Sequence, residues 1–194
     1  MKKNTLETIS VHFKEHLELI SSISELHYGQ ISETATKIAQ SLSNGGTLFW
    51  CGNGGSAADS QHLAAELVGR FKKDRKALRS ISLTTDTSVL TCVANDYSYE
   101  DIFSRQLEAL AMSDDVLVVI STSGNSENVL RALRAAKDLR VKTVALLGKD
   151  GGQAKALADL AIVIPSNSTA RIQEAHILIG HILCDLIEQE LGLA

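Results

Sequence analysis

The first 44 residues carry apolar side chains three and four positions apart, the spacing that gathers them on one face of a helix. The pattern breaks near Tyr28-Gly29 and closes at Asn44-Gly45-Gly46, a sequence typical of a helix end. We therefore predict two helices within residues 1–45, as an N-terminal helical extension that packs on the core or on a second copy of the chain. The apolar positions are Leu6, Ile9, Phe13, Leu17 and Ile20, then Ile31, Ala35, Ile38, Ala39 and Leu42.

Beyond residue 46, short apolar runs alternate with longer stretches of helical spacing. Runs that are apolar throughout are typical of strands buried on both faces, and helices between them favour a parallel sheet. We predict one domain over residues 1–194, with 46–194 as an α/β core: a doubly wound, five-stranded parallel sheet of the flavodoxin-like type. The expected strands are 47–51, 79–83, 116–120, 143–147 and 161–164, and the expected helices are 56–70, 87–94, 99–112, 126–139 and 171–191, with a short one at 151–157.

The composition is that of an ordinary globular protein, with 44% hydrophobic and 22% charged residues among 194. A net charge of −4 and an aromatic share of 4% argue against a nucleic-acid partner, because such surfaces are basic and often offer stacking rings. The longest apolar run, 116–120, is far too short to cross a membrane. Three cysteines without metal-ligand spacing and the lack of a signal-peptide core favour a reducing compartment. We expect a cytoplasmic protein without a membrane partner.

The loops after the strands are the places to look for a ligand, because a doubly wound sheet binds ligands at the carboxyl ends of its strands. The first loop, Gly52-Asn53-Gly54-Gly55-Ser56, has glycines that let backbone N–H groups approach a ligand, and it opens a helix whose N-terminus favours anions. It matches neither the dinucleotide pattern nor the P-loop pattern. A tight turn between strand and helix explains it equally well.

Two further loops carry oxygen-rich side chains. Asn95 and Asp96 end the expected short helix, where they can bind sugar hydroxyls, although a simple turn is the favoured interpretation. Ser121, Thr122, Ser123 and Ser126 follow the most apolar strand and open the next helix. Three or four hydroxyls beside a helix N-terminus suit a phosphate monoester, whereas a helix cap needs only one of them. We therefore predict a phosphate site in this loop.

Candidate chemistry lies on two helices. His62 and Glu66 stand four residues apart on one helical face, where an imidazole and a carboxylate can bind one metal ion or form a solvated surface pair. On the last helix, Gln173 and His181 lie about 12 Å apart along the axis. His181 stands among apolar residues, a setting typical of a core histidine. Spacing alone does not make these residues a metal site.

Several long stretches together resemble the phosphoheptose isomerases, a group within the sugar isomerase (SIS) domain family. The resemblance runs over nearly the whole chain and is carried by CGNGGSAADSQHLAAELVGRF at 51–71, LTTDTSVLTCVANDYSYEDIFSRQ at 83–106, ISTSGNSENVLRAL at 120–133, LLGKDGG at 146–152 and RIQEAHILIGHILCDLIE at 171–188.

The resemblance implies a homotetrameric enzyme with active sites at subunit interfaces. It would convert sedoheptulose 7-phosphate to D-glycero-D-manno-heptose 7-phosphate through an enediol, for heptose and lipopolysaccharide core synthesis. Glu66 and His181 would carry the proton transfers, and one Zn²⁺ per subunit would be bound. The implied zinc ligands are His62, Glu66, Gln173 and His181, and the implied substrate contacts are Asn53, Gly54, Gly55, Glu66, Asn95, Asp96, Ser121, Thr122, Ser123, Ser126 and Gln173.

A near relative with the same fold is the alternative: a non-enzymatic SIS-domain protein that binds the bacterial replication initiator. The sequence resembles that protein at 169–174 and 183–187. In that relative the catalytic acid and the late histidine are replaced, whereas Glu66 and His181 are both present here, which favours the isomerase. A third class, the sugar-responsive transcription regulators, carries an added DNA-binding domain for which 194 residues leave no room.

Overall fold

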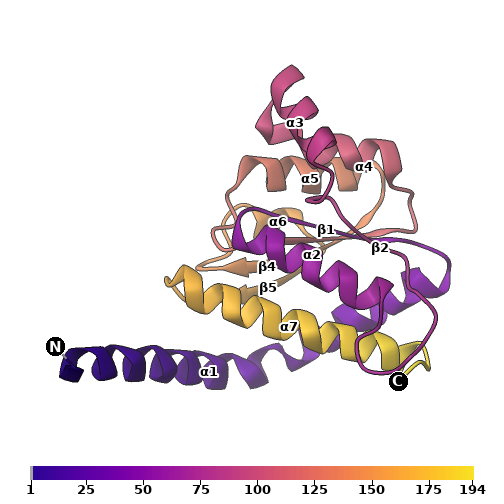
Figure 1. The fold of residues 1–194 in the computed structure, drawn as a ribbon. Helices are drawn as coiled ribbons and strands as arrows, with labels where there is room; N and C mark the ends of the chain where they lie inside the picture. Colours follow the sequence, from indigo (N-terminus) through magenta and orange to yellow (C-terminus); the bar gives the residue numbers. More distant parts are fainter. Residues whose placement is uncertain (1) are drawn as a thin grey trace.

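Five parallel strands form one sheet in the order β2-β1-β3-β4-β5 (Figure 1). The computed structural model describes residues 2–194, apart from the side chains of residues 2, 3 and 25. This strand order is that of the flavodoxin-like doubly wound fold, so the predicted fold class is confirmed. The strands are β1 (Leu48–Gly52), β2 (Ser80–Ser82), β3 (Val116–Ser121), β4 (Lys142–Gly148) and β5 (Leu160–Ile164).

Helices cover both faces of the sheet and form a three-layer molecule (Figure 1). One face carries α1 (Lys2–Ser43), α2 (Gly55–Val68) and α7 (Thr169–Glu190). The other carries α3 (Thr87–Asp96), the 3₁₀ turn η1 (Tyr99–Asp101), α4 (Ser104–Leu110), α5 (Glu127–Asp138) and α6 (Ala154–Leu157). The predicted helix 99–112 is therefore divided into η1 and α4, and the other predicted elements after residue 46 agree to within a few residues.

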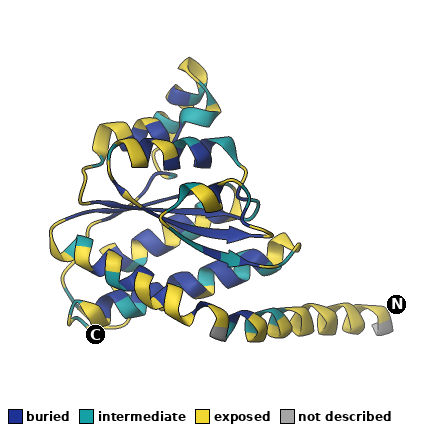
Figure 2. Cartoon of the chain, turned by 180° about the vertical axis from the view of Figure 1, so that it is seen from behind, coloured by how far each residue is buried: buried dark blue, intermediate teal, exposed yellow. Residues whose placement is uncertain are grey.

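Neighbouring strand residues supply two separate cores, because successive side chains of a strand point to opposite faces. Trp50 packs with α1, α2 and α7, while Phe49 and Cys51 pack with the helices of the other face. Figure 2 shows the strands buried between the two helical layers. The indole Nε1 of Trp50 donates to the hydroxyl of Ser80 at 2.9 Å, so even the polar atom of this buried ring has a partner.

The N-terminal extension is a single helix, and the predicted break at Tyr28-Gly29 is wrong. A glycine inside a helix costs only about 1 kcal/mol relative to alanine, which tertiary packing readily offsets. Such packing is present here: Ile31 is buried, and the imidazole Nε2 of His27 lies 3.0 Å from the carbonyl oxygen of Val163. The predicted end of the extension is confirmed, since α1 closes at Ser43 and Gly45 has a φ of 88°.

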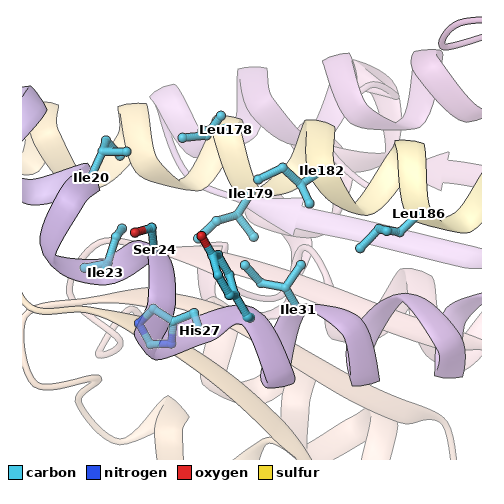
Figure 3. A pocket seen from close by; sticks show the side chains of 10 residues that line it. Ile20, Ile23, Ser24, His27, Ile31, Leu178, Ile179, Ile182 and Leu186 are labelled. Carbon is cyan, nitrogen blue, oxygen red and sulfur yellow. The ribbon is translucent and has the colours of Figure 1, made fainter.

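The axis of α1 nevertheless changes direction near Ser24 (Figure 3). The hydroxyls of Ser22 and Ser24 donate to the carbonyl oxygens of Leu19 and Ser21, and such bonds to the preceding turn bend helices. As a result the first half of α1 projects beyond the body of the molecule and is largely exposed (Figures 1 and 2). Within residues 2–194, no helix has an apolar stretch sufficient to cross a bilayer.

Candidate active site

Helices α2 and α7 lie side by side and run in the same direction (Figure 1). Near their N-terminal ends Gly55 meets Gln173: a Cβ at Gly55 would stand 2.4 Å from the amide nitrogen of Gln173. Further along, a Cβ at Gly180 would stand 2.5 Å from Cδ1 of Leu63. The lack of a side chain at Gly55 leaves room for the amide of Gln173, and its lack at Gly180 leaves room for Leu63, so both glycines favour the close approach of the helices.

The close approach brings together three of the predicted residues. Nε2 of His62 lies 2.9 Å from Nε2 of His181 and 3.2 Å from Oε1 of Glu66. The two imidazole rings meet edge to face, with centroids 5.1 Å apart. The side chain of His62 is 49% exposed and that of Glu66 is 23% exposed, so the group opens to solvent. His181 is therefore not a sealed core histidine, which was one of the two interpretations of its apolar neighbours.

This triad of His62, Glu66 and His181 suits a metal ion. One donor atom from each side chain lies within 4.8 Å of the other two. Tetrahedral zinc holds its ligands at about 2.1 Å, which places them about 3.4 Å from one another, close to the spacing found here. Two imidazole nitrogens and a carboxylate oxygen are also the ligand types that zinc prefers, and three protein ligands leave a position open for substrate.

Gln173, the fourth predicted ligand, lies elsewhere on α7. Its amide group rests against Gly55, at the glycine loop and about two helical turns before His181. Among residues 2–194, no hydrogen bond joins it to the triad. The structure thus places Gln173 with the predicted sugar contacts of the glycine loop rather than within the triad.

Asp59 is a neighbour of the triad that the sequence analysis missed. It precedes His62 by one turn of α2, and its Oδ2 is buried without a hydrogen-bond partner among the described residues. Burial raises the pKa of its carboxyl, while His62 and His181 act in the opposite direction. Its spacing of three and seven residues from His62 and Glu66 places all three on one helical face, a signal that the sequence already contained.

The glycine loop and the serine loop are joined through Asn53. Its side-chain amide forms a reciprocal pair with that of Asn128 in the first turn of α5, with both N···O distances 2.9 Å. The phenol of Tyr99 donates to Oδ1 of Asn53 at 3.0 Å. Strands β1 and β3 are neighbours, so the two predicted binding loops lie at the same edge of the sheet. The sequence analysis missed Asn128 because an asparagine in the first turn of a helix carries no signal that distinguishes it from an ordinary helical residue.

Hydroxyls in the serine loop divide into two kinds. Those of Ser121 and Ser123 accept hydrogen bonds from the backbone N–H groups of Gly124 and Asn125, at 3.1 and 3.2 Å. Within the described part of the chain, the hydroxyls of Thr122 and Ser126 have no hydrogen-bond partner. Ser126 occupies the N-cap position of α5, yet its side chain makes no capping bond. Helix capping therefore does not account for this residue, and its hydroxyl remains available beside the unpaired N–H groups of the first turn.

Asn95 and Asp96 stay apart from the other predicted contacts. They end α3, where Nδ2 of Asn95 donates to Oδ1 of Asp96 at 2.7 Å and both side chains are exposed. Across residues 2–194, no hydrogen bond or ion pair links either residue to the triad or to the two loops. Figure 1 shows α3 above α4 and α5, away from α2 and α7.

Two of the three cysteines, Cys51 and Cys184, are buried. Burial, followed by the nearby charges of Glu66 and Glu188, raises the pKa of Cys184 to about 12. Cys51 is fully buried, and burial raises the pKa of its thiol as well. Burial thus favours the neutral form of both thiols at neutral pH, which does not suit a nucleophile.

Known proteins share both the sequence and the fold. The SIS domain matches residues 12–148. A phosphoheptose isomerase of Helicobacter pylori (strain P12) is 52% identical over 183 residues, 94% of this chain and 95% of that protein. One from Aquifex aeolicus (strain VF5) is 51% identical over 184 residues, 95% of this chain and 96% of that protein. The solved structure of phosphoheptose isomerase GmhA from Neisseria gonorrhoeae is 42% identical, with a TM-score of 0.91 over 95% of this chain and 99% of that one.

The strand order, the extent of the domain match and the glycine and serine loops define the class of protein: the chain belongs to the SIS domain family. Within that family it falls among the phosphoheptose isomerases, whose identity to it exceeds 50% over nearly its whole length.

Proposed function

We propose that the protein is a phosphoheptose isomerase that converts sedoheptulose 7-phosphate to D-glycero-D-manno-heptose 7-phosphate, for heptose and lipopolysaccharide core synthesis. One observation carries the proposal: Glu66, His62 and His181 meet on adjacent helices in a chain 52% identical to proteins of that name. The alternative, a protein that binds the replication initiator, is not favoured, because Glu66 and His181, the residues that distinguish the isomerases from that relative, are both present and meet in one group.

The isomerisation moves a proton between two adjacent carbons through an enediol. In our proposal Glu66 removes the proton from one carbon and returns it to the next, since a carboxylate can act first as base and then as acid. His181 would transfer a proton at the carbonyl oxygen, because a neutral imidazole has one ring nitrogen that donates and one that accepts. The contact between His62 and both residues supports the assignment, as it holds the two groups near one reacting centre.

The phosphate end of the substrate would be held by the serine loop. Thr122 and Ser126 offer free hydroxyls, and the N-terminus of α5 adds backbone N–H groups and a partial positive charge. Ser121 and Ser123 would contribute to the same loop, and Asn53, Gly54, Gly55 and Gln173 would contact the sugar. Fixing both ends of the chain orients the reacting carbons, which lowers the barrier. Asn95 and Asp96 remain proposed contacts that would require a different arrangement or a neighbouring subunit.

We also propose one zinc ion per subunit, held by His62, Glu66 and His181. When bound, zinc would polarise the carbonyl oxygen of the sugar as a Lewis acid. Glu66 has two carboxylate oxygens, so it can offer one to the ion and keep the other for the proton. Gln173 is the proposed fourth ligand: its side chain would have to turn from Gly55 toward the triad, where it would occupy the open position until the sugar replaces it.

The proposed assembly is a homotetramer with active sites at subunit interfaces. Two features support it: the triad is open to solvent in the single chain, and the projecting half of α1 carries exposed apolar residues. An apolar pocket of about 270 Å³ continues this surface between α1 and α7, lined by Ile20, Ile23, Ile31, Leu178, Ile182 and others (Figure 3). Such a surface is typical of a protein interface.

The decisive test is turnover of sedoheptulose 7-phosphate by the wild type, with and without a chelator, and by Glu66→Gln. Glutamine keeps the shape of the side chain but cannot accept the carbon-bound proton, so we expect kcat to fall by about 10²- to 10⁴-fold while the fold and assembly persist. Glu190→Gln, at the exposed end of α7, is the matched control and should keep full activity. Wild-type turnover by Glu66→Gln would reject the assigned base, and initiator binding without isomerase activity would favour the alternative.

A further inference from the structure

A fully buried ion pair lies just beyond the triad, where α2 and α7 end. Nε of Arg75 donates to Oε1 of Glu188 at 2.8 Å, and the two side chains are 2% and 0% exposed. Burying two charges is costly, and an apolar pair of similar size is often as stable or more stable. Stability alone therefore does not explain why the ion pair of Arg75 and Glu188 is buried here. The further hydrogen bonds of the two side chains indicate another role.

Arg75 holds the segment of α2 that carries Glu66. Its guanidinium donates to the carbonyl oxygens of Glu66 at 2.9 Å, Leu67 at 2.7 Å and Gly69 at 3.0 Å. The last carbonyls of a helix have no partner within the helix, and here one arginine satisfies three around its end. The backbone of Glu66 is thus fixed directly by the buried ion pair.

Glu188 holds the opposite side of the triad through Phe71. The same carboxylate oxygen that pairs with Arg75 accepts the backbone N–H of Phe71 at 3.1 Å. The ring of Phe71 stacks on the imidazole of His181, with centroids 5.6 Å apart and planes 22° apart. A rotation of His181 away from His62 would have to displace a ring whose backbone is bonded to a buried charge.

We propose that Arg75, Glu188 and Phe71 are positioning residues of the triad: Arg75 fixes Glu66, and Glu188 fixes His181 through Phe71. The proposal rests on the function proposed above for the triad and adds how its geometry is maintained. It explains why a costly buried charge pair stands at this point of the fold, and why its partners are the backbone of one proposed ligand and the stacking ring of another.

The chain offers a matched control. Lys72 and Asp185 form a second ion pair between the same loop and the same helix, with Nζ 2.6 Å from Oδ2. Their side chains are 59% and 26% exposed, and neither touches the triad by hydrogen bond. Exposed pairs of this kind contribute little. Nζ of Lys72 also lies 5.8 Å from the centroid of the Phe71 ring, so the control changes only Asp185: Asp185→Asn removes an ion pair from the same interface and leaves Lys72, Phe71 and the hydrogen bonds of Arg75 and Glu188 in place.

The experiment measures zinc affinity by competition with a chromogenic chelator, for purified wild type, Glu188→Gln, Arg75→Lys, Phe71→Leu, Phe71→Tyr and Asp185→Asn. We expect the dissociation constant for zinc to rise about 10- to 100-fold in Glu188→Gln, Arg75→Lys and Phe71→Leu, as for other residues that orient metal ligands. Phe71→Tyr, which keeps the stacking ring, and Asp185→Asn should stay within about twofold of wild type. In the variants that lose zinc affinity, kcat should fall as well. The KM for the sugar phosphate should be unchanged, because the proposed phosphate contacts in the serine loop lie far from Arg75, Glu188 and Phe71.

Wild-type zinc affinity in Phe71→Leu, or equal losses in Phe71→Tyr and Phe71→Leu, would overturn the proposal. If Glu188→Gln does not fold, the two Phe71 variants decide, since they leave the ion pair intact. The two proposals fail separately. If zinc affinity depends on Phe71 but the protein has no isomerase activity, only the enzyme function is rejected. If the protein is an active isomerase whose zinc affinity is unchanged by substitution of Phe71, Arg75 and Glu188, only the positioning role is rejected.

Discussion

His176 shows how one buried side chain links the helix of the candidate site to the stability of the molecule. It lies on α7, fully buried, with Nε2 3.0 Å from the carbonyl oxygen of Leu147 in β4. Burial lowers its pKa to about 4, from an ordinary value of 6.5. In that environment the neutral imidazole is strongly favoured, so the residue is a structural anchor of α7 and not a proton donor near neutral pH.

This shift predicts a loss of stability in mild acid. Between pH 6.5 and 4 the unfolded chain binds a proton at His176 that the folded chain does not, so the free energy of unfolding falls as the pH falls through this window. From pH 7 to pH 5 the contribution is about 2 kcal/mol. Urea denaturation at fixed protein concentration measures it, with His176→Gln as reference, because glutamine can still donate to Leu147. The pH-dependent loss should be smaller by that amount in the variant; equal losses would contradict the shift.

At the scale of secondary structure, the N-cap residues of α3 and α5 differ: one caps its helix through its side chain and the other does not. The side chain of Asp86 accepts the backbone N–H of Val89 at 3.0 Å and so caps α3. Ser126 occupies the same position of α5 without capping it. Capping therefore accounts for Asp86 but not for Ser126, and the phosphate site in the Ser126 loop stays a prediction.

Substitution of Ser126 and of Asp86 should have opposite effects on stability and on KM. Ser126→Ala should leave stability unchanged and raise KM for the sugar phosphate several-fold, because the hydroxyl has no structural partner and is proposed to contact phosphate. Asp86→Ala should lower the free energy of unfolding by about 1 kcal/mol through loss of the cap and leave KM unchanged. Thermal unfolding and steady-state kinetics on both variants check this, and a destabilised Ser126→Ala with normal KM would identify a hidden cap instead of a phosphate contact.

Helix boundaries also show what the sequence could and could not predict. Apolar runs and helical spacing indicated every strand after residue 46 and the helices between them, apart from the division of 99–112 into η1 and α4, because both faces of the sheet are covered and the patterns are strong. Tyr28-Gly29 misled the prediction, since one glycine is a weak signal when packing by His27 and Ile31 continues on either side. The bend near Ser24, caused by serine hydroxyls, left no clear mark in the apolar pattern.

At the scale of the whole molecule, the residues of the candidate site were predictable but their meeting was not. His62 and Glu66 share a helical face that spacing reveals, whereas His62 and His181 are 119 positions apart and meet because α2 and α7 pack side by side, with Gly180 against Leu63. The ion pair of Arg75 and Glu188 spans 113 positions and has no sequence pattern. Long-range contacts of this kind depend on how helices pack on the sheet, which local periodicity does not encode.

The projecting half of α1 gives the prediction that concerns the whole assembly. Leu6, Phe13 and Leu17 are exposed on it, while His16 contacts Glu174, the neighbour of Gln173, at 2.7 Å. A subunit that docks on this half of α1 would therefore adjoin the sugar contacts of α7, as expected for active sites at interfaces. Each buried side chain of this size contributes about 1.5–3 kcal/mol to association.

Phe13→Glu combined with Leu17→Glu should therefore weaken assembly by at least about 100-fold and reduce the mass measured by light scattering after gel filtration. Turnover per subunit should fall along with the mass, because the substrate contacts near Gln173 lose their neighbouring subunit. Lys14→Gln, a polar change at an exposed position of the same helix between the two, is the control and should keep both the mass and the turnover of the wild type. A double variant that retains the wild-type mass would show that α1 is not the interface. A smaller assembly with full turnover would show instead that each subunit builds its active site alone, and the exposed triad would then be complete within one chain.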